Sequence, residues 1–201
     1  YTKYNIFVRP LLVLYKFYHK VFSKLEIKLL KIMNRTIYVQ YQGDDARQGD
    51  FCQRNFEISV VNSVEDGYYS QKSDETKRHN IKVFEKIADK IFCLNPDLLH
   101  VVPNATFLPY AHIDIFDYPF IGVTDTRTLT IGHAPSHRGA KGTKQILEAV
   151  NKLKKEGLSF NFKLIEGLTF SQAQEQFKEI DVLIDQLFAG WYGAVAVELM
   201  A

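Results

Sequence analysis

The chain has 201 residues, of which 46% are hydrophobic and 24% are charged, so it can bury a core as one large or two small domains. The formal net charge is only +2, although residues 1–35 hold eight Lys and Arg against one acidic residue. This composition excludes a disordered chain. The longest apolar stretch, residues 11–15, is far below the roughly 20 residues that span a bilayer, and no signal-peptide cleavage site follows it.

The N-terminal segment predicts a short strand over residues 5–8 and a long basic helix over residues 11–33, with Pro10 in its first turn. Apolar residues recur along this helix at three- and four-residue steps, and lysines follow the same period on another face. Two interpretations stay open. The helix could pack on a sheet with its lysines in water, or it could contact an anionic membrane surface from the cytoplasmic side.

Residues 36–41 are rich in β-branched and aromatic side chains and predict a strand that ends at a Gly/Asp loop. Apolar spacing over residues 81–91 predicts a helix, and residues 90–94 predict a second strand. Three prolines then interrupt a stretch with little periodicity, so residues 103–126 are interpreted as a crossing between two domains.

The remaining chain alternates between strand and helix patterns. Residues 128–132, 160–165 and 181–185 predict strands, and residues 143–155 predict an amphipathic helix. A further helix ends at Phe177, with Thr169 or Ser171 as its cap, and a last helix begins at Gly193. Strands that alternate with helices predict an α/β fold with parallel sheets.

In such sheets ligands bind beyond the carboxyl ends of the strands. The segment after the strand over residues 128–132 carries His133-Ala-Pro-Ser-His-Arg-Gly-Ala-Lys-Gly-Thr143, in which Arg138 and Lys141 could donate charge-assisted hydrogen bonds to a phosphate. A solvated basic surface is the alternative. Of the histidines at 133 and 137, one is expected to cap the strand end and the other to be exposed.

Another such place carries Gly190-Trp-Tyr-Gly-Ala-Val-Ala-Val-Glu198, which leads from a strand into a helix. Gly193 would permit close backbone approach, and Glu198 could accept hydrogen bonds from a ribose diol, although a helical glutamate is usually only surface. Cys52 and Cys93 form no metal-ligand cluster and are expected to be reduced and buried, so no metal site is predicted.

This C-terminal run resembles the E-G-F-G-x-x-x-x-E-A-M-A signature of the family-four retaining glycosyltransferases of GT-B fold (the glycosyl transferases group 1 type). Arg138, Lys141 and Gly142 look like the basic phosphate loop of that family. Residues 41–47 resemble its strand followed by G-[ST]-D-[IV]-R, and residues 95–104 resemble the segment before its interdomain linker.

The resemblance implies a sugar transfer from a nucleotide-diphosphate donor to an unknown glycan or lipid-linked acceptor, without a cofactor or metal. Arg138 and Lys141 would neutralise the leaving diphosphate, and Gly142, Tyr192, Gly193 and Glu198 would complete the donor site. Gly43, Asp45 and Arg47 would lie on the acceptor side, unless Asp45 and Arg47 form only a surface ion pair. The chain departs from the signature at Gly190, where the first glutamate is expected.

We therefore expect a GT-B-like arrangement of two facing Rossmann-like domains, residues 1–118 on the acceptor side and residues 119–201 on the donor side, both truncated. Two alternatives stay open, a non-catalytic nucleotide-sugar-binding or scaffold module and a GT-B-like nucleotide-sugar epimerase. Nucleic acid is not an expected partner, because the chain after residue 35 is acidic and no nucleic-acid module appears.

Overall fold

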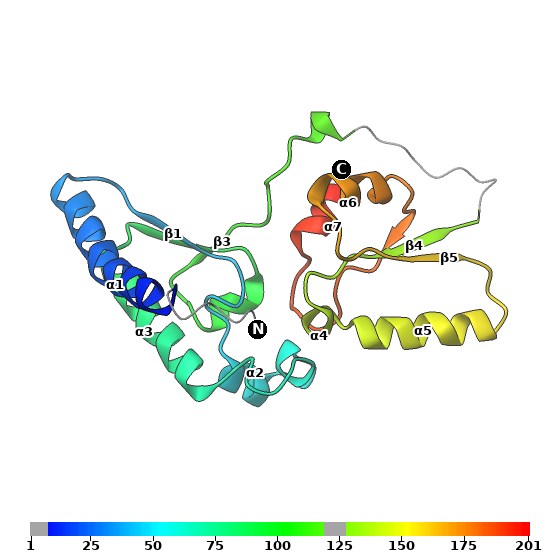
Figure 1. The fold of residues 1–201 in the computed structure, drawn as a ribbon, viewed down its shortest axis with the longest axis horizontal. Helices are drawn as coiled ribbons and strands as arrows, with labels where there is room; N and C mark the ends of the chain where they lie inside the picture. The colour runs from blue at the N-terminus through cyan, green and yellow to red at the C-terminus, as the bar shows by residue number, and fades with distance from the viewer. Residues whose placement is uncertain (1–7, 119–127) are drawn as a thin grey trace.

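The computed structural model describes residues 8–118 and 128–201, and it shows a mixed α/β chain with two separate parallel sheets (Figure 1). The first sheet has the order β1-β2-β3, formed by Tyr38–Tyr41, Lys90–Cys93 and Thr106–Phe107. The second has the order β5-β4-β6, formed by Asn161–Leu164, Thr130–His133 and Val182–Leu183. Parallel strands need long crossovers, and helices occupy most of them. The predicted α/β class with parallel sheets is confirmed, and each sheet is consistent with a Rossmann-like fold.

The first sheet covers a small core made by strands, helix α3 (Gln71–Ile87) and the 3-10 helix η2 (Pro96–His100). Its fully or nearly buried members are apolar: Tyr41, Ala46, Ile81, Ile91, Cys93, Leu98 and Val102. The predicted start of the helix near residue 81 was wrong. Helix α3 begins ten residues earlier because Ser70 and Ser73 form a reciprocal capping box that the apolar period does not reveal.

Helix α2 (Gly49–Asn55) was not predicted. Its first amides donate to a residue distant in sequence, with Gly49 N and Asp50 N at 3.0 and 2.9 Å from the two carboxylate oxygens of Asp74. Asp74 is 2% exposed, so this carboxylate is satisfied almost entirely by the α2 amides and its neighbours. A cap supplied from α3 leaves no local signal in the α2 sequence.

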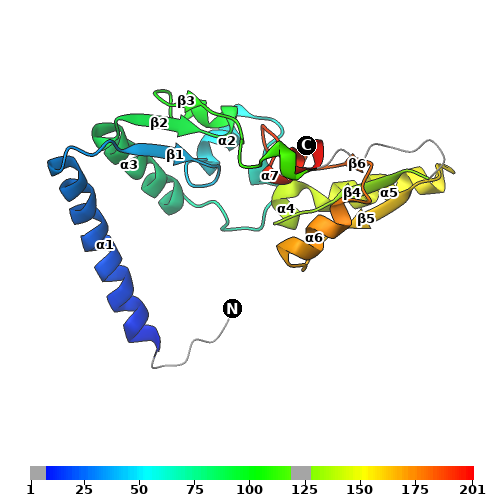
Figure 2. The same ribbon diagram turned by 90° about the horizontal axis from the view of Figure 1, so that it is seen from above.

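Helix α1 (Val8–Ile32) confirms the predicted basic helix, and Figure 2 shows it projecting away from the first sheet. Packing of its apolar face on the sheet was one of the two interpretations, and the described side chains do not bear it out. Leu14, Leu25 and Ile32 are 65%, 52% and 82% exposed. Near the end of α1, Lys31 Nζ lies 2.9 Å from Asp89 Oδ2. No helix among residues 8–118 and 128–201 is long and apolar enough to cross a membrane.

The second sheet is closer to the predicted pattern. Helix α5 (Thr143–Lys155) has the predicted bounds, and α6 (Phe170–Phe177) begins after the predicted cap Thr169, which forms a capping box with Gln172. Helix α7 (Ala194–Met200) follows Gly193. Ile146 and Val150 of α5 are buried at 3% and 6% exposure, so α5 contributes the main apolar face of this half.

The structure differs from the predictions for two further segments, the strand over residues 5–8 and the crossing over residues 103–126. Residues 5–7 of the predicted first strand lie outside the described residues, and Val8 is helical. The segment interpreted as a crossing contains the short strand β3 and the 3-10 helix η3 (Ile115–Asp117), while residues 119–127 lie outside the described residues.

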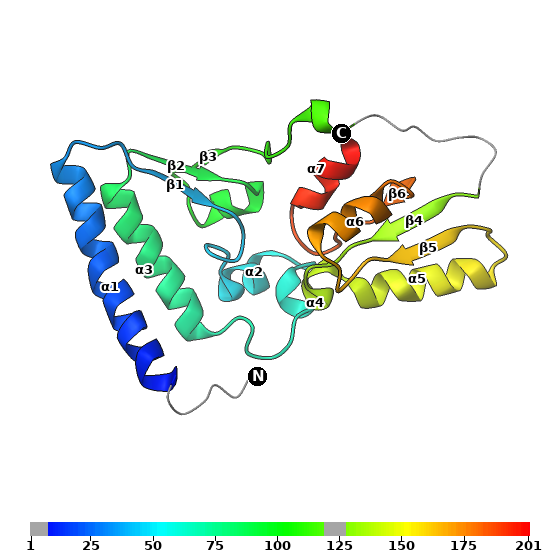
Figure 3. The same ribbon diagram turned by 45° about the horizontal axis from the view of Figure 1, so that its top comes forward.

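The two halves meet at helix α4 (Arg138–Lys141) and the 3-10 helix η1 (Val60–Asn62), between the two sheets in Figure 3. Gly139 of α4 lies so close to the first half that an added Cβ would be 2.6 Å from the carbonyl oxygen of Ser63. His137 stacks edge-on against Tyr68, with ring centroids 5.2 Å apart. The absence of a side chain at residue 139 therefore sets how closely the halves approach here.

Candidate functional site

His133, the last residue of β4, connects the second sheet to the start of α5. Its Nδ1 lies 2.7 Å from the carbonyl oxygen of Ile184, and its Nε2 lies 2.8 Å from Thr143 Oγ1. Because a carbonyl only accepts, Nδ1 donates, and in the neutral ring Nε2 then accepts from the Thr143 hydroxyl. Burial lowers the pKa of His133, which keeps the ring neutral. One of the two histidines was expected at the strand end, and His133 lies there, whereas His137 is half-buried and not exposed as the other was expected to be.

The basic segment after β4 is a helical turn and not the predicted loop. His137 caps α4 by accepting from Ala140 N, and Gly142 closes the turn in the left-handed region at φ 77°. A Cβ at Gly142 would lie 2.9 Å from the Phe188 ring and 3.0 Å from Leu187, so both backbone conformation and crowding favour glycine. This turn orients Lys141 toward the segment after β6.

Lys141 is the centre of a polar cluster at the carboxyl end of the second sheet. Its Nζ lies 2.8 Å from Asp185 Oδ1 and 2.7 Å from Gln186 Oε1, and the Gly193 amide donates to Asp185 Oδ2. The Lys141 and Asp185 side chains are 14% and 12% exposed. A Cβ at Gly193 would lie 2.8 Å from the Lys141 ammonium, so glycine permits this close approach. The carboxylate of Asp185 thus lies between a lysine and a backbone amide.

Arg138 does not share this cluster. Its Nε donates to Glu166 Oε1 at 2.8 Å, and its Nη2 donates to Oε2, with the arginine side chain 61% exposed. Glu166 lies two residues after the end of β5, so the pair joins α4 to the segment that follows this strand. The hydrogen bonds from Arg138 lower the pKa of Glu166, which keeps the carboxylate charged.

Glu198 lies on α7, five residues after Gly193, with a side chain that is 8% exposed. Its Oε1 lies 3.3 Å from His112 Nε2, and its Oε2 is buried without a hydrogen-bond partner. Buried acceptors are seldom unpaired in folded proteins, and an unpaired one calls for an explanation such as a missing ligand. Tyr192 contacts Tyr110 of the connecting segment, with ring centroids 6.4 Å apart.

The three predicted acceptor-side residues lie after β1. Asp45 accepts from Gln42 N and Gly43 N and so stabilises its own turn. Arg47 is buried at 7% exposure and does not pair with Asp45, so the surface ion pair that was an alternative is wrong. Arg47 Nε donates to Asp97 Oδ2 at 2.9 Å, and Nη1 donates to Asp44 Oδ1 at 2.8 Å.

Asp44 joins this arginine to two tyrosines through hydrogen bonds. It also accepts from the Tyr68 hydroxyl at 2.6 Å and the Tyr69 hydroxyl at 2.5 Å. Burial alone would raise the pKa of Asp44, but the two tyrosines and Arg47 lower it below its usual range. Burial opposes the charge of Arg47, and the hydrogen bond and charge of Asp97, with Asp44, outweigh burial and raise its pKa. Both groups are therefore charged at neutral pH.

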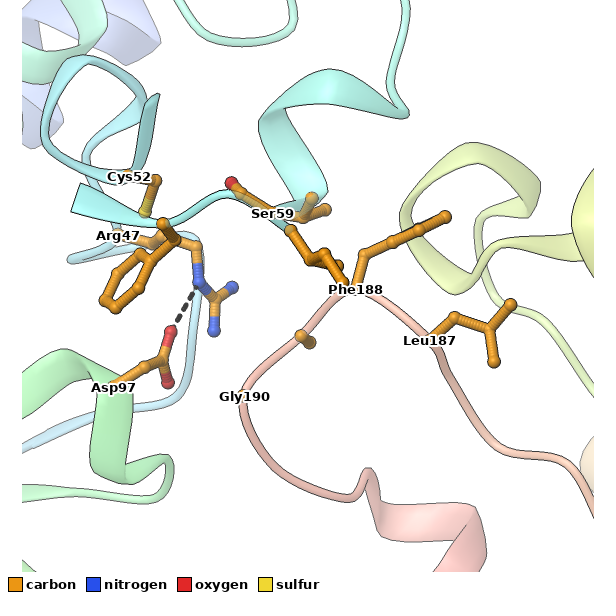
Figure 4. A pocket seen from close by; sticks show the side chains of 11 residues that line it. Arg47, Cys52, Ser59, Asp97, Leu187, Phe188 and Gly190 are labelled. Atoms are coloured by element: carbon orange, nitrogen blue, oxygen red, sulfur yellow. Dashed lines mark hydrogen bonds and ion pairs between the residues drawn. The ribbon is translucent and has the colours of Figure 1, made fainter. Parts of the chain in front are cut away.

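A cavity of about 240 Å³ lies between the halves (Figure 4). Arg47 and Asp97 line one side, and residues 187–190 line the other. Asp97 Oδ1 is buried and has no hydrogen-bond partner. Cys52 also lines the cavity, and burial raises the pKa of its thiol to about 11, so it is a protonated thiol at neutral pH. Cys93 is likewise buried and free, as predicted.

Among the described residues, no group of three or more His, Cys, Asp or Glu is arranged to hold a metal ion. The fold and these sites define a mixed α/β protein with a cluster of polar groups at the carboxyl end of its second parallel sheet. Comparison of the chain with protein-family models, with curated proteins and with solved structures finds no match in any of the three.

Proposed function

We propose that this chain forms the donor site of a nucleotide-sugar glycosyltransferase, with two Rossmann-like halves facing each other in a GT-B-like manner. The proposal rests on two features at helix α7: a lysine and a backbone amide at its start, and an unpartnered carboxylate oxygen farther along it. Lys141 and the Gly193 amide converge at the start of α7, and the unpartnered Glu198 Oε2 lies farther along it. Five residues of helix separate them by about 7.5 Å along the axis.

A diphosphate and a ribose present complementary chemistry. The diphosphate oxygens would accept from Lys141 Nζ and the Gly193 amide, and a ribose hydroxyl would donate to Glu198. The diphosphate gains charge as the sugar departs, and a fixed ammonium stabilises that charge without reorganisation. Retention of stereochemistry rests only on the sequence resemblance.

The Asp185 carboxylate holds the position of the expected anion, with one oxygen on Lys141 and the other at the Gly193 amide. A diphosphate would compete with this carboxylate for both donors. The acceptor would bind from the first half, where Gly43, Asp45 and Arg47 lie after β1. Arg138 belongs to the donor site only if a ligand draws it away from Glu166, because both of its bonded nitrogens now face that carboxylate.

A non-catalytic nucleotide-sugar-binding module is the second candidate. Gly190 in place of a glutamate and the neutralisation of Lys141 by Asp185 favour it. Donor turnover separates the two candidates, because a binding module would bind the nucleotide sugar without hydrolysing or transferring the sugar.

The test is a titration of full-length protein with UDP, GDP and their sugar conjugates, read as ligand-dependent thermal stabilisation and Kd. Lys141→Met should lower the affinity for the nucleotide diphosphate about ten- to a hundredfold, because a charge-assisted hydrogen bond of about 1.5–3 kcal/mol is lost. Lys144→Met is the matched control, since Lys144 is exposed on α5. Absence of nucleotide binding by the unmodified protein would refute the proposal.

A further inference from the structure

The cavity between the halves combines charged and apolar walls. On the first-half side, Arg47 and Asp97 form an ion pair whose side chains are only 9% and 15% exposed. On the other side, Phe188 and Gly190 come from the segment between β6 and α7. Phe56 adds a second aromatic ring to the lining. Aromatic faces beside a hydrogen-bonding carboxylate suit a ligand with both C–H and hydroxyl surfaces.

Asp97 is held in one orientation and leaves one oxygen for a ligand. Arg47 Nε binds its Oδ2 at 2.9 Å, and Arg47 is itself fixed by Asp44 at 2.8 Å. The other oxygen, Oδ1, has no partner and is buried. An unpaired buried acceptor costs about 1–3 kcal/mol, and a hydroxyl donor from a ligand would recover that free energy.

Gly190 lets the segment after β6 approach Asp97 closely without a side chain covering the carboxylate. A Cβ at residue 190 would lie 3.1 Å from Asp97 Cβ and 3.7 Å from Oδ1. Any larger side chain at residue 190 would therefore occupy the space in front of Asp97. Gly190 and Asp97 are thus complementary across the boundary between the halves, one supplying the space and the other the polar group.

The cavity adjoins the proposed diphosphate and ribose contacts, and its lining does not include Lys141, Gly193 or Glu198. Leu187 and Phe188 pack on Gly142, the neighbour of Lys141, and residue 190 lies three positions before Gly193. Its volume of about 240 Å³ is below the 300–1,000 Å³ of sites that enclose whole drug-sized ligands. The size suits one small ring and excludes a complete nucleotide sugar.

We propose that this cavity is a sugar-ring subsite, in which Asp97 accepts a hydrogen bond from a ring hydroxyl and Gly190 provides the room for it. The ring is the glycosyl group of the donor, and the proposal therefore rests on the proposed function. The carboxylate that the C-terminal segment lacks at residue 190 is supplied by Asp97 from the opposite half.

The experiment compares a nucleotide with its sugar conjugate in the full-length protein, using UDP against UDP-glucose and GDP against GDP-mannose. Asp97→Asn preserves the side-chain volume and an acceptor for Arg47. It should leave the Kd of the nucleotide diphosphate unchanged and weaken the sugar conjugate about ten- to a hundredfold. Gly190→Ala tests the same subsite from the other wall and should weaken the conjugate selectively as well.

Asp50→Asn is the matched control, because Asp50 forms ion pairs with Arg54 and Arg78 in the same half and does not line the cavity. It should not change the preference for the conjugate. If Asp97→Asn leaves the preference intact, or weakens nucleotide and conjugate equally, the subsite is refuted while the proposed function stands.

A third arm identifies the source of the ring. Free glucose or mannose is titrated with UDP or GDP present. If Asp97→Asn loses this sugar binding and the control variant keeps it, the subsite is supported with an acceptor ring in place of the donor ring. If no nucleotide binds the unmodified protein, the proposed function fails. Free-sugar binding that is insensitive to Asp97→Asn then refutes the subsite too.

Discussion

Asp185→Asn should strengthen nucleotide-diphosphate binding and weaken the fold at the same time. The Asp185 carboxylate lies 2.8 Å from Lys141 Nζ, in a pair whose side chains are 12% and 14% exposed. Two unit charges 4 Å apart near a protein surface interact by about 4 kcal/mol, so removing this charge frees much of the lysine field for a diphosphate. Gln186 still binds Lys141, which reduces the gain. We expect about tenfold to hundredfold tighter binding, or about 1.4–2.8 kcal/mol.

The same substitution removes charge-assisted hydrogen bonds from Lys141 and from the Gly193 amide. Each such bond to a charged group is worth about 1.5–3 kcal/mol, so the free energy of unfolding should fall by at least that amount. A Tm shift of about 2–4 °C per kcal/mol then gives a decrease of roughly 3–12 °C. Affinity and stability move in opposite directions, which general unfolding cannot produce.

The assay is calorimetric titration with UDP or GDP beside urea unfolding of the same preparations. Glu179→Gln is the matched control, because Glu179 pairs with Lys163 in an exposed ion pair of the same half. That pair should contribute below about 1 kcal/mol and should leave binding unchanged. Unchanged or weaker nucleotide binding in Asp185→Asn would refute the idea that the carboxylate competes with the phosphate.

Three further predictions concern single positions. Glu198→Gln should erase the preference for UDP over 2′-deoxy-UDP with little change in unfolding free energy, because Oε2 has no protein partner to lose; an unchanged preference in matched titrations would contradict the ribose role. Gly139→Ala should lower stability by about 1–3 kcal/mol in urea unfolding, because its Cβ would meet the Ser63 carbonyl at 2.6 Å. His133→Gln should flatten the dependence of Tm on pH below about 6.5, as thermal unfolding at several pH values would show. The folded pKa of His133 is lowered, so the unfolded chain binds more protons and acid destabilises the native protein.

Elements with a local signal were predictable. Helix α5 has its predicted bounds because apolar spacing and a glycine before Thr143 define both its face and its start. Helix α6 follows the capping box of Thr169 in the same way. Helices α2 and α4 are short, and tertiary contacts stabilise them, such as the Asp74 carboxylate beneath α2. Their sequences alone give too little periodicity for a prediction.

The candidate site was predictable only in part, for the same reason. Lys141 and Glu198 were proposed from the segments that follow strands, and the rule for parallel sheets indicates those segments. Asp185 ends the predicted strand 181–185, so that rule could have indicated it. Asp97 could not be found in this way, because its significance comes from contact with Gly190, more than ninety residues away and in the other half.

The connection between the halves also contacts the proposed donor helix. His112 lies 3.3 Å from Glu198 Oε1, and Tyr110 packs near Tyr192 before α7. A ligand that binds the Glu198 carboxylate would compete with His112 and so weaken the contact between this connection and α7. Ligand binding and the docking of this connection on α7 would then be thermodynamically linked, so any substitution that strengthens the docking would change ligand affinity by the same factor as the ligand changes the docking.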